Sequence, residues 1–128
     1  MKKFLTLFVV VATISMVAAP VFAHHGRGQT YAMDQVITLK GTVSEVVWRN
    51  PHVLYYVDVE DADGKVVSWA FENGGVSQLA REGYHRNTLT VGQEITADVH
   101  PARNGAPTSI VVKVILPDGT EMMCRECD

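Results

Sequence analysis

The chain has 128 residues, of which 11 are basic and 14 are acidic, so its formal net charge is −3. This length suits one small domain behind a short leader. The acidic balance argues against a nucleic-acid-binding protein, which would carry a basic stripe.

The first 23 residues have the pattern of a secretory signal peptide. Lys2 and Lys3 precede a nearly continuous apolar run, and residues 21–23 provide the small side chains that a signal peptidase recognises. The apolar run ends at Pro20 and is shorter than the ~20 residues that a membrane span requires. We therefore expect cleavage after Ala23, export to the periplasm or the medium, and no membrane span afterwards.

The rest of the chain divides into three parts. Residues 24–35 are polar and contain glycine, which predicts an N-terminal arm; residues 36–119 form a β-rich domain; and residues 120–128 form a tail. Apolar and polar side chains alternate in five segments, which predicts five strands. These segments are 35–48, 53–61, 65–72, 89–101 and 110–116.

Two features interrupt this alternation. Gly41, in the middle of the first predicted strand, indicates a bulge or a sharp bend. Between the third and fourth strands the apolar residues take a helical spacing, at Val76, Leu79, Ala80 and Tyr84. Three strands, a short helix and two strands are the order of a mainly β, five-stranded Greek-key barrel of the oligonucleotide/oligosaccharide-binding (OB) type.

Two of the five histidines are expected to begin the mature chain. After cleavage His24 carries a free α-amine, and His25 follows it. An amine, an amide nitrogen and imidazoles form the nitrogen-rich, planar ligand set that suits Cu(II) or Ni(II) best. The alternative is that two exposed histidines in an arm bind nothing specific. We favour metal binding, with copper or another transition metal as the only cofactor that the sequence implies.

His52 and His100 each lie next to a proline at the predicted end of a strand. Either one could complete a metal site begun by the arm, with Asp98 orienting an imidazole. The alternation places His100 with Thr96 and Asp98 on the outer face of its strand. Each histidine alone is also explained as a surface residue that bonds to backbone or water.

Trp48 and Trp69 fall on adjacent predicted strands. Paired aromatic side chains on a barrel face can stack on a sugar or a base, whereas in a small domain they often fill the core. We favour the core and keep the stacking platform as the alternative. Asn50 and Glu72, which follow these tryptophans in the sequence, are the polar candidates for contacts with a small ligand or a protein partner.

Cys124 and Cys127 form a C-x-x-C near the end of the sequence. In an oxidising compartment a disulfide is the default, although so short a loop gains little from chain entropy. We expect a local clip on a frayed end. With Met122 and Met123, the reduced thiols would instead provide soft ligands for Cu(I). A thioredoxin-like activity is poorly supported, because no βαβ pattern surrounds the motif.

The mature start "HH", together with "GTVSEVVWRNPH", "WAFE" and "VGQEITADVHPARNG", resembles a family of small exported bacterial proteins of unknown function. Its members share H-H, G-x-V, W-x-N-P-H and W-x-x-E in this order, and W-x-N-P-H is the most specific of these motifs. The resemblance covers nearly all of residues 24–119 and leaves out the cysteine tail. It implies an exported β-barrel domain and brings no activity.

These observations lead to one main hypothesis and two alternatives. The main hypothesis is a periplasmic binding protein that holds copper or another transition metal through His24 and His25, with help from His52 or His100. The first alternative is a non-enzymatic envelope protein whose barrel face binds a small ligand or a protein partner, without metal. A copper oxidase built on the same histidines is least favoured, because no enzyme motif is recognisable.

Overall fold

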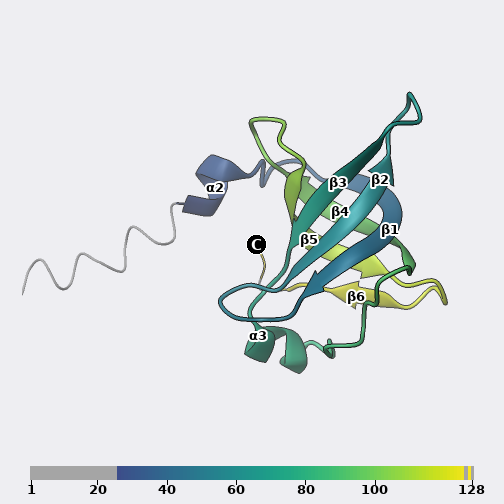
Figure 1. Ribbon diagram of the computed structural model, residues 1–128. Helices are drawn as coiled ribbons and strands as arrows, with labels where there is room; N and C mark the ends of the chain where they lie inside the picture. Colours follow the sequence, from purple (N-terminus) through teal and green to yellow (C-terminus); the bar gives the residue numbers. More distant parts are fainter. Residues whose placement is uncertain (1–25, 126, 128) are drawn as a thin grey trace, which may run out of the picture.

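The computed structural model describes residues 26–125 and 127, and Figure 1 shows them as a small barrel with two short helices outside it. The helices are α2 (Gly26–Thr30) and α3 (Val76–Arg81). The strands are β1 (Ile37–Val47), β2 (Leu54–Glu60), β3 (Val66–Glu72), β4 (Glu94–Pro101), β5 (Thr108–Ile115) and β6 (Glu121–Met123). Neither of the helices described is long and apolar enough to cross a membrane.

Five strands close into a barrel in the order β3-β2-β1-β4-β5. Neighbours in this order are antiparallel. The barrel closes through a parallel pairing of β3 with β5, in which residues 70–72 lie beside residues 108–110. Helix α3 connects β3 to β4 and lies at one end of the barrel (Figure 1). This connectivity is that of an OB-type Greek-key barrel, so the predicted fold is confirmed.

Strand β1 follows the curve of the barrel because Gly41 lets its neighbours come close. Gly41 pairs with both β2 and β4. A Cβ atom at this position would collide with the carbonyl oxygen of Asp58 in β2. The register between β1 and β2 shifts between Val43 and Glu45, so the irregularity that the glycine predicts lies shortly after it.

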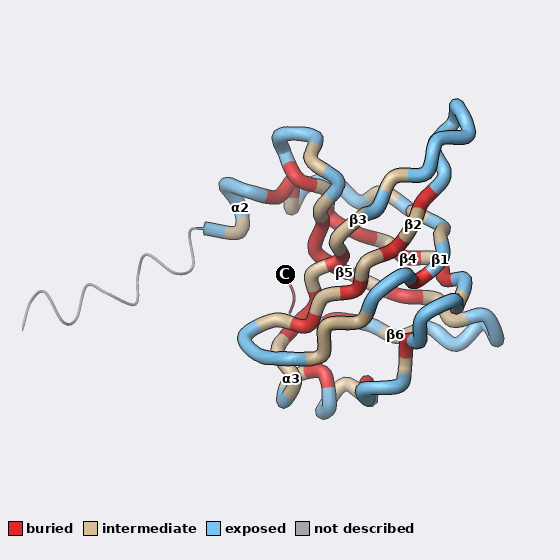
Figure 2. Tube along the Cα trace, viewed as in Figure 1, coloured by how far each residue is buried: buried red, intermediate tan, exposed pale blue. Residues whose placement is uncertain are grey.

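Buried residues, red in Figure 2, fill the barrel, and along β2 and most of β4 they alternate with more exposed ones. Val53, just before β2, and Tyr55, Val57 and Val59 of β2 are buried, as are Ile95, Ala97 and Val99 of β4. All of them lie on the faces that the alternation predicts. Helix α3 adds Leu79, which is fully buried, whereas Ala80, expected on the same face, is exposed. The helix ends at Arg81, so it is too short to bury a wider stripe.

Strand β6 lies in the segment after residue 120, which the sequence predicts to be a tail. It pairs antiparallel with residues 113–115 of β5, after a turn at Gly119, whose φ is 86°. A strand of three residues is too short for an alternation to be recognised in the sequence. The sheet therefore continues past the five barrel strands, and the two cysteines follow directly after its last strand.

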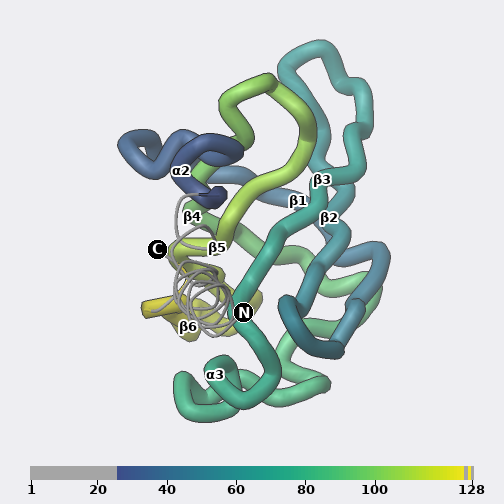
Figure 3. The backbone as a smooth tube through the Cα atoms, turned by 90° about the vertical axis from the view of Figure 1, so that its left-hand side faces the viewer, coloured from purple at the N-terminus to yellow at the C-terminus, as the bar shows by residue number. Residues whose placement is uncertain are grey.

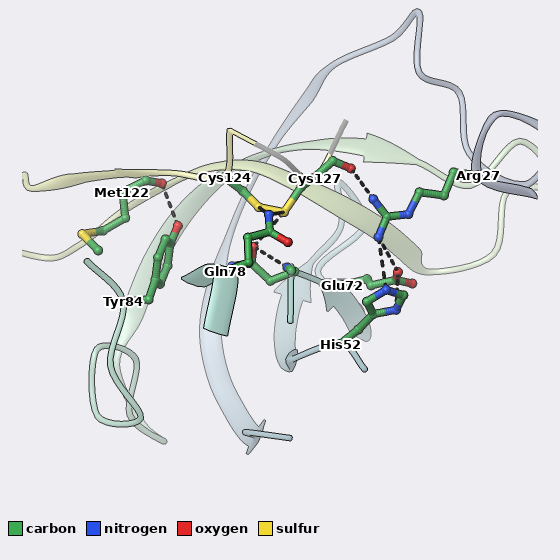
Figure 4. Close-up of a disulfide and its surroundings, with 10 residues drawn as sticks. Arg27, His52, Glu72, Gln78, Tyr84, Met122, Cys124 and Cys127 are labelled. Carbon is green, nitrogen blue, oxygen red and sulfur yellow. Dashed lines mark hydrogen bonds and ion pairs between the residues drawn. A yellow bond between two sulfur atoms is a disulfide. The ribbon is translucent and has the colours of Figure 1, made fainter. Parts of the chain in front are cut away.

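Tyr84 connects β6 to the segment after α3. Its hydroxyl donates to the carbonyl of Met122 at 2.8 Å (Figure 4), and burial raises the pKa of Tyr84 to about 12.

We predict that Tyr84→Phe lowers the free energy of unfolding by ~1–3 kcal/mol, because the Met122 carbonyl loses this donor. Urea denaturation at neutral pH measures the loss. Tyr56→Phe, on the outer face of β2, is the matched control and should cost less than ~0.5 kcal/mol. Equal losses in the two variants would contradict this role of Tyr84.

Candidate functional site

A row of paired residues crosses the strands where the barrel closes. Glu72 of β3 pairs with Leu54 of β2 on one side and with Ile110 of β5 on the other. Ile110 in turn pairs with His100 of β4. Because neighbouring strands lie ~4.8 Å apart, Glu72 and His100 are two strand spacings from each other.

The N-terminal arm lies along this row. Tyr31 forms an antiparallel bridge with Ala102, and the N–H of Ala32 donates to the carbonyl of Pro101 at 2.9 Å. Arg103, in the loop between β4 and β5, donates to the carbonyl of Gly28 at 3.0 Å. Figure 3 shows the result, with α2 packed beside the β4–β5 loop. From α2 onward, the arm therefore packs against the barrel at the end of β4 and the β4–β5 loop.

The W-x-N-P-H and W-x-x-E motifs meet at His52 and Glu72. His52 lies in the loop before β2, after the cis peptide bond between Asn50 and Pro51, and Glu72 is the last residue of β3. Nδ1 of His52 is 2.9 Å from Oε1 of Glu72 (Figure 4). The side chains of His52 and Glu72 are 40% and 20% exposed, so the pair is partly sheltered from water while the ring stays accessible.

Arg27 of α2 joins this pair to the end of the chain. Its Nη2 lies 3.2 Å from Nε2 of His52 and 3.9 Å from Oε1 of Glu72. Its Nη1 donates to the carbonyl of Cys127 at 3.0 Å. One guanidinium thus contacts the β1–β2 loop, the end of β3 and the C-terminal segment (Figure 4).

These contacts favour one tautomer of a neutral His52 ring. A guanidinium only donates hydrogen bonds, so Nε2 accepts from Arg27 and carries a lone pair. Nδ1 then carries the hydrogen and donates a hydrogen bond to Oε1 of Glu72. A carboxylate that accepts from one ring nitrogen while the other keeps its lone pair is the usual arrangement around a metal-binding histidine.

Tyr31 holds the second oxygen of Glu72. The Tyr31 hydroxyl donates to Oε2 of Glu72 at 3.1 Å and lies 3.5 Å from Oγ1 of Thr108. Burial is the main cause that raises the pKa of Tyr31, so its hydroxyl stays protonated at neutral pH. Both oxygens of the Glu72 carboxylate have partners, which fixes the position of the carboxylate beneath His52.

His100 corrects one expectation from the sequence. The alternation places it on the outer, solvent-facing side of β4, yet it is only 6% exposed. Its Nδ1 is 2.6 Å from the carbonyl oxygen of Gln35. The arm contacts His100 through Gln35, and periodicity within β4 cannot reveal this contact.

The structure describes only two of the four predicted metal ligands, His52 and His100. His24 and His25 lie outside the described residues. Within residues 26–125 and 127, no three His, Cys, Asp or Glu side chains gather into a group that could hold a metal ion. Asp98 accepts from the Thr38 hydroxyl at 2.6 Å and lies 3.5 Å from Nζ of Lys113. His52 is the predicted ligand whose geometry the structure defines best.

The other predicted binding residues have structural contacts. Trp48 and Trp69 are partly buried and pack against the core cluster. Oδ1 of Asn50 accepts from the N–H of Val76 at 3.0 Å, at the start of α3. Gly75, the residue before the helix, has no side chain to cap it, so the asparagine of W-x-N-P-H supplies the oxygen from another loop.

Cys124 and Cys127 are joined by a disulfide (Figure 4) and are 2% and 1% exposed. The N–H of Cys124 donates to the carbonyl of Val112 at 2.9 Å, and Sγ of Cys127 lies 3.1 Å from Oδ1 of Asn73. The expectation of a frayed end is therefore wrong, because Cys124 and Cys127 belong to the buried core. In this oxidised form the sulfurs are not thiolate ligands for Cu(I).

Arg27 and Tyr31 are the site residues that the sequence reasoning missed. Arg27 follows the histidine pair in a short polar stretch, and Tyr31 precedes the first alternating segment. No periodicity or motif in either stretch marks a partner, because Glu72, the residue that both contact, is more than 40 positions away. The position of Arg27 next to "HH" is the one signal that could have pointed to it.

The fold and this cluster define a small OB-type barrel with a histidine–carboxylate pair beneath an N-terminal arm. The chain belongs to a family of unknown function, DUF6152, whose model matches residues 11–111. No curated protein matches the chain. A solved structure of the mitochondrial single-stranded DNA binding protein Rim1 from S. cerevisiae is similar over 65% of this chain and 93% of that chain, at 10% sequence identity and a TM-score of 0.49.

The bond from Asn50 to α3 can be tested by substitution. We predict that Asn50→Ala lowers the free energy of unfolding by ~0.5–2 kcal/mol, because the N–H of Val76 loses its acceptor. Asn50→Asp keeps an acceptor oxygen and should retain most of the stability. Guanidinium denaturation followed by tryptophan fluorescence measures both. If Asn50→Ala and Asn50→Asp lower the free energy of unfolding equally, the acceptor oxygen is not the group that stabilises the start of α3.

Proposed function

We propose that this protein is an exported transition-metal-binding protein, with copper as the preferred metal. The proposed ligands are His52, through Nε2, and His24 and His25 of the arm. The observation that carries the proposal is that the N-terminal arm reaches Nε2 of His52, where Arg27 contacts it at 3.2 Å. The arm therefore runs past the one nitrogen of His52 that keeps a lone pair.

The spacing in the chain supports this ligand set. His25 precedes Arg27 by two residues, so their Cα atoms are no more than ~7 Å apart. We infer that this stretch of chain is short enough to allow a histidine at position 24 or 25 to approach a metal on Nε2 of His52. The described residues lack a third metal ligand near His52, and the arm histidines would supply it.

The ligand types favour copper. If cleavage follows Ala23, the α-amine and ring of His24 with the next amide nitrogen and imidazole provide several nitrogen donors close together. His52 adds one more imidazole, and Glu72 orients it from the second nitrogen. Such nitrogen-rich sites suit Cu(II) and, next to it, Ni(II). We assign His100, which is hydrogen-bonded to the arm, to docking the arm and not to the metal.

The His52–Glu72 pair gives the first prediction on metal binding. In the protein that begins at His24, Glu72→Gln should weaken Cu(II) binding about tenfold, because the ring loses the carboxylate that orients it. His52→Ala should weaken it at least as much. Glu94→Gln, which removes an exposed carboxylate paired with Lys40, is the control and should leave the affinity unchanged. Competition against a chelator of known copper affinity measures all three. Unchanged binding by His52→Ala would remove His52 from the site.

The α-amine of His24 gives an independent prediction. One extra glycine before His24 moves the amine away from the first imidazole and should weaken Cu(II) binding markedly. The same competition titration compares the two forms, with His52→Ala measured in each. Equal affinity with and without the extra glycine would exclude the amine as a ligand, while leaving the role of His52 to be judged from its own variant.

A further inference from the structure

We propose that Cys124 and Cys127 form a redox site, which exchanges between a disulfide and a buried pair of thiols and takes a dithiol as its reaction partner. A thiolate of the partner attacks one sulfur, the bond between the cysteines breaks, and a mixed disulfide forms. The second thiol of the partner then releases it. The partner leaves as a disulfide, and the two cysteines gain two electrons and two protons. This inference does not depend on metal binding.

The side-chain oxygen of Asn73 is the observation that carries this proposal. Oδ1 of Asn73 lies 3.1 Å from Sγ of Cys127, and both residues are only 1% exposed. The N–H of Gly74 donates to the same oxygen at 3.0 Å, which fixes the orientation of the side-chain amide. The atom that faces the buried sulfur is therefore a hydrogen-bond acceptor.

Only the reduced protein can donate to this acceptor. A sulfur in a disulfide carries no hydrogen, whereas a thiol is a hydrogen-bond donor. Reduction thus turns the contact between Cys127 and Asn73 into an S–H···O hydrogen bond. The buried site provides a partner that the disulfide form does not use, which indicates that the dithiol is a stable state of the folded protein.

Gln78 of α3 provides a donor for the reaction itself. Its Nε2 lies 3.9 Å from Sγ of Cys124 and 4.0 Å from Sγ of Cys127 (Figure 4). When the mixed disulfide forms, the leaving sulfur carries a negative charge, and an amide N–H beside it stabilises that charge. A role in stability alone explains the bridge less well, because a cross-link that closes so short a loop restrains the unfolded chain little.

Main-chain hydrogen bonds hold both cysteines in place without the bridge. The N–H of Cys124 donates to the carbonyl of Val112 at 2.9 Å, and Arg27 donates to the carbonyl of Cys127 at 3.0 Å. The two thiols therefore stay close after reduction, which allows the disulfide to form again. Because the cysteines are 2% and 1% exposed, the partner reaches them through local opening of the segment after β6, a strand of only three residues.

The redox equilibrium with dithiothreitol tests the role of Asn73. Asn73→Leu removes the acceptor of the reduced form and should shift the equilibrium toward the disulfide about threefold to tenfold, the effect of one net hydrogen bond. The bond from Gly74 is lost in both redox states, so its loss cancels. Asn104→Leu is the matched control, because Oδ1 of Asn104 accepts from the N–H of Ala106 on the exposed surface. It should leave the equilibrium unchanged. Acid quenching, alkylation and mass spectrometry measure the two forms.

An equilibrium that Asn73→Leu leaves unchanged, or shifts toward the dithiol, would overturn the inference. A second measurement needs no change at position 73. The infrared spectrum of the reduced, unchanged protein should contain one S–H stretching band at the lowered frequency of a hydrogen-bonded thiol, and Cys127→Ala should remove this band. Two bands of free thiols, or loss of the near-ultraviolet circular dichroism on reduction, would equally overturn the inference.

Discussion

The parallel pairing of β3 with β5 is the constraint on which the site depends. It closes the barrel, and it places Glu72 at the end of β3 beside Ile110, with His100 one strand further. The β1–β2 loop ends next to the same edge of the barrel, and His52 in this loop contacts Glu72. Because the hydrogen bonds of a closed barrel leave few alternative registers, these side chains meet as a consequence of the fold.

Around this edge, several distant segments stabilise one another. The arm binds the end of β4 through Tyr31 and Ala32, and Arg27 links it to His52, Glu72 and the carbonyl of Cys127. The disulfide is buried against the segment between β3 and α3, where Asn73 lies. The two ends of the described chain therefore share one edge of the barrel, where the carboxylate of Glu72 contacts both Arg27 and Tyr31 of the arm.

The sequence predicts most of the fold because strand alternation and the change to a helical period are local signals. Val53, Tyr55, Val57 and Val59 are buried as their spacing indicates, and the order of elements identifies the barrel. The sequence does not predict the features that depend on contacts between distant segments. His100 is buried where Gln35 of the arm contacts it, Cys124 is buried just after the short strand β6, and the partners of Glu72 come from remote segments. The family motifs point to His52 and Glu72, but only the structure pairs them.

The central claim is that Nε2 of His52 is a metal ligand and that Glu72 holds its ring from the other side. Pulsed electron paramagnetic resonance of the Cu(II)-loaded protein tests this most directly, because the remote nitrogen of each coordinated imidazole gives its own modulation. We predict that the spectrum of His52→Ala shows one coordinated imidazole fewer than that of the protein beginning at His24, at equal copper content. Identical spectra from the two proteins would contradict the claim.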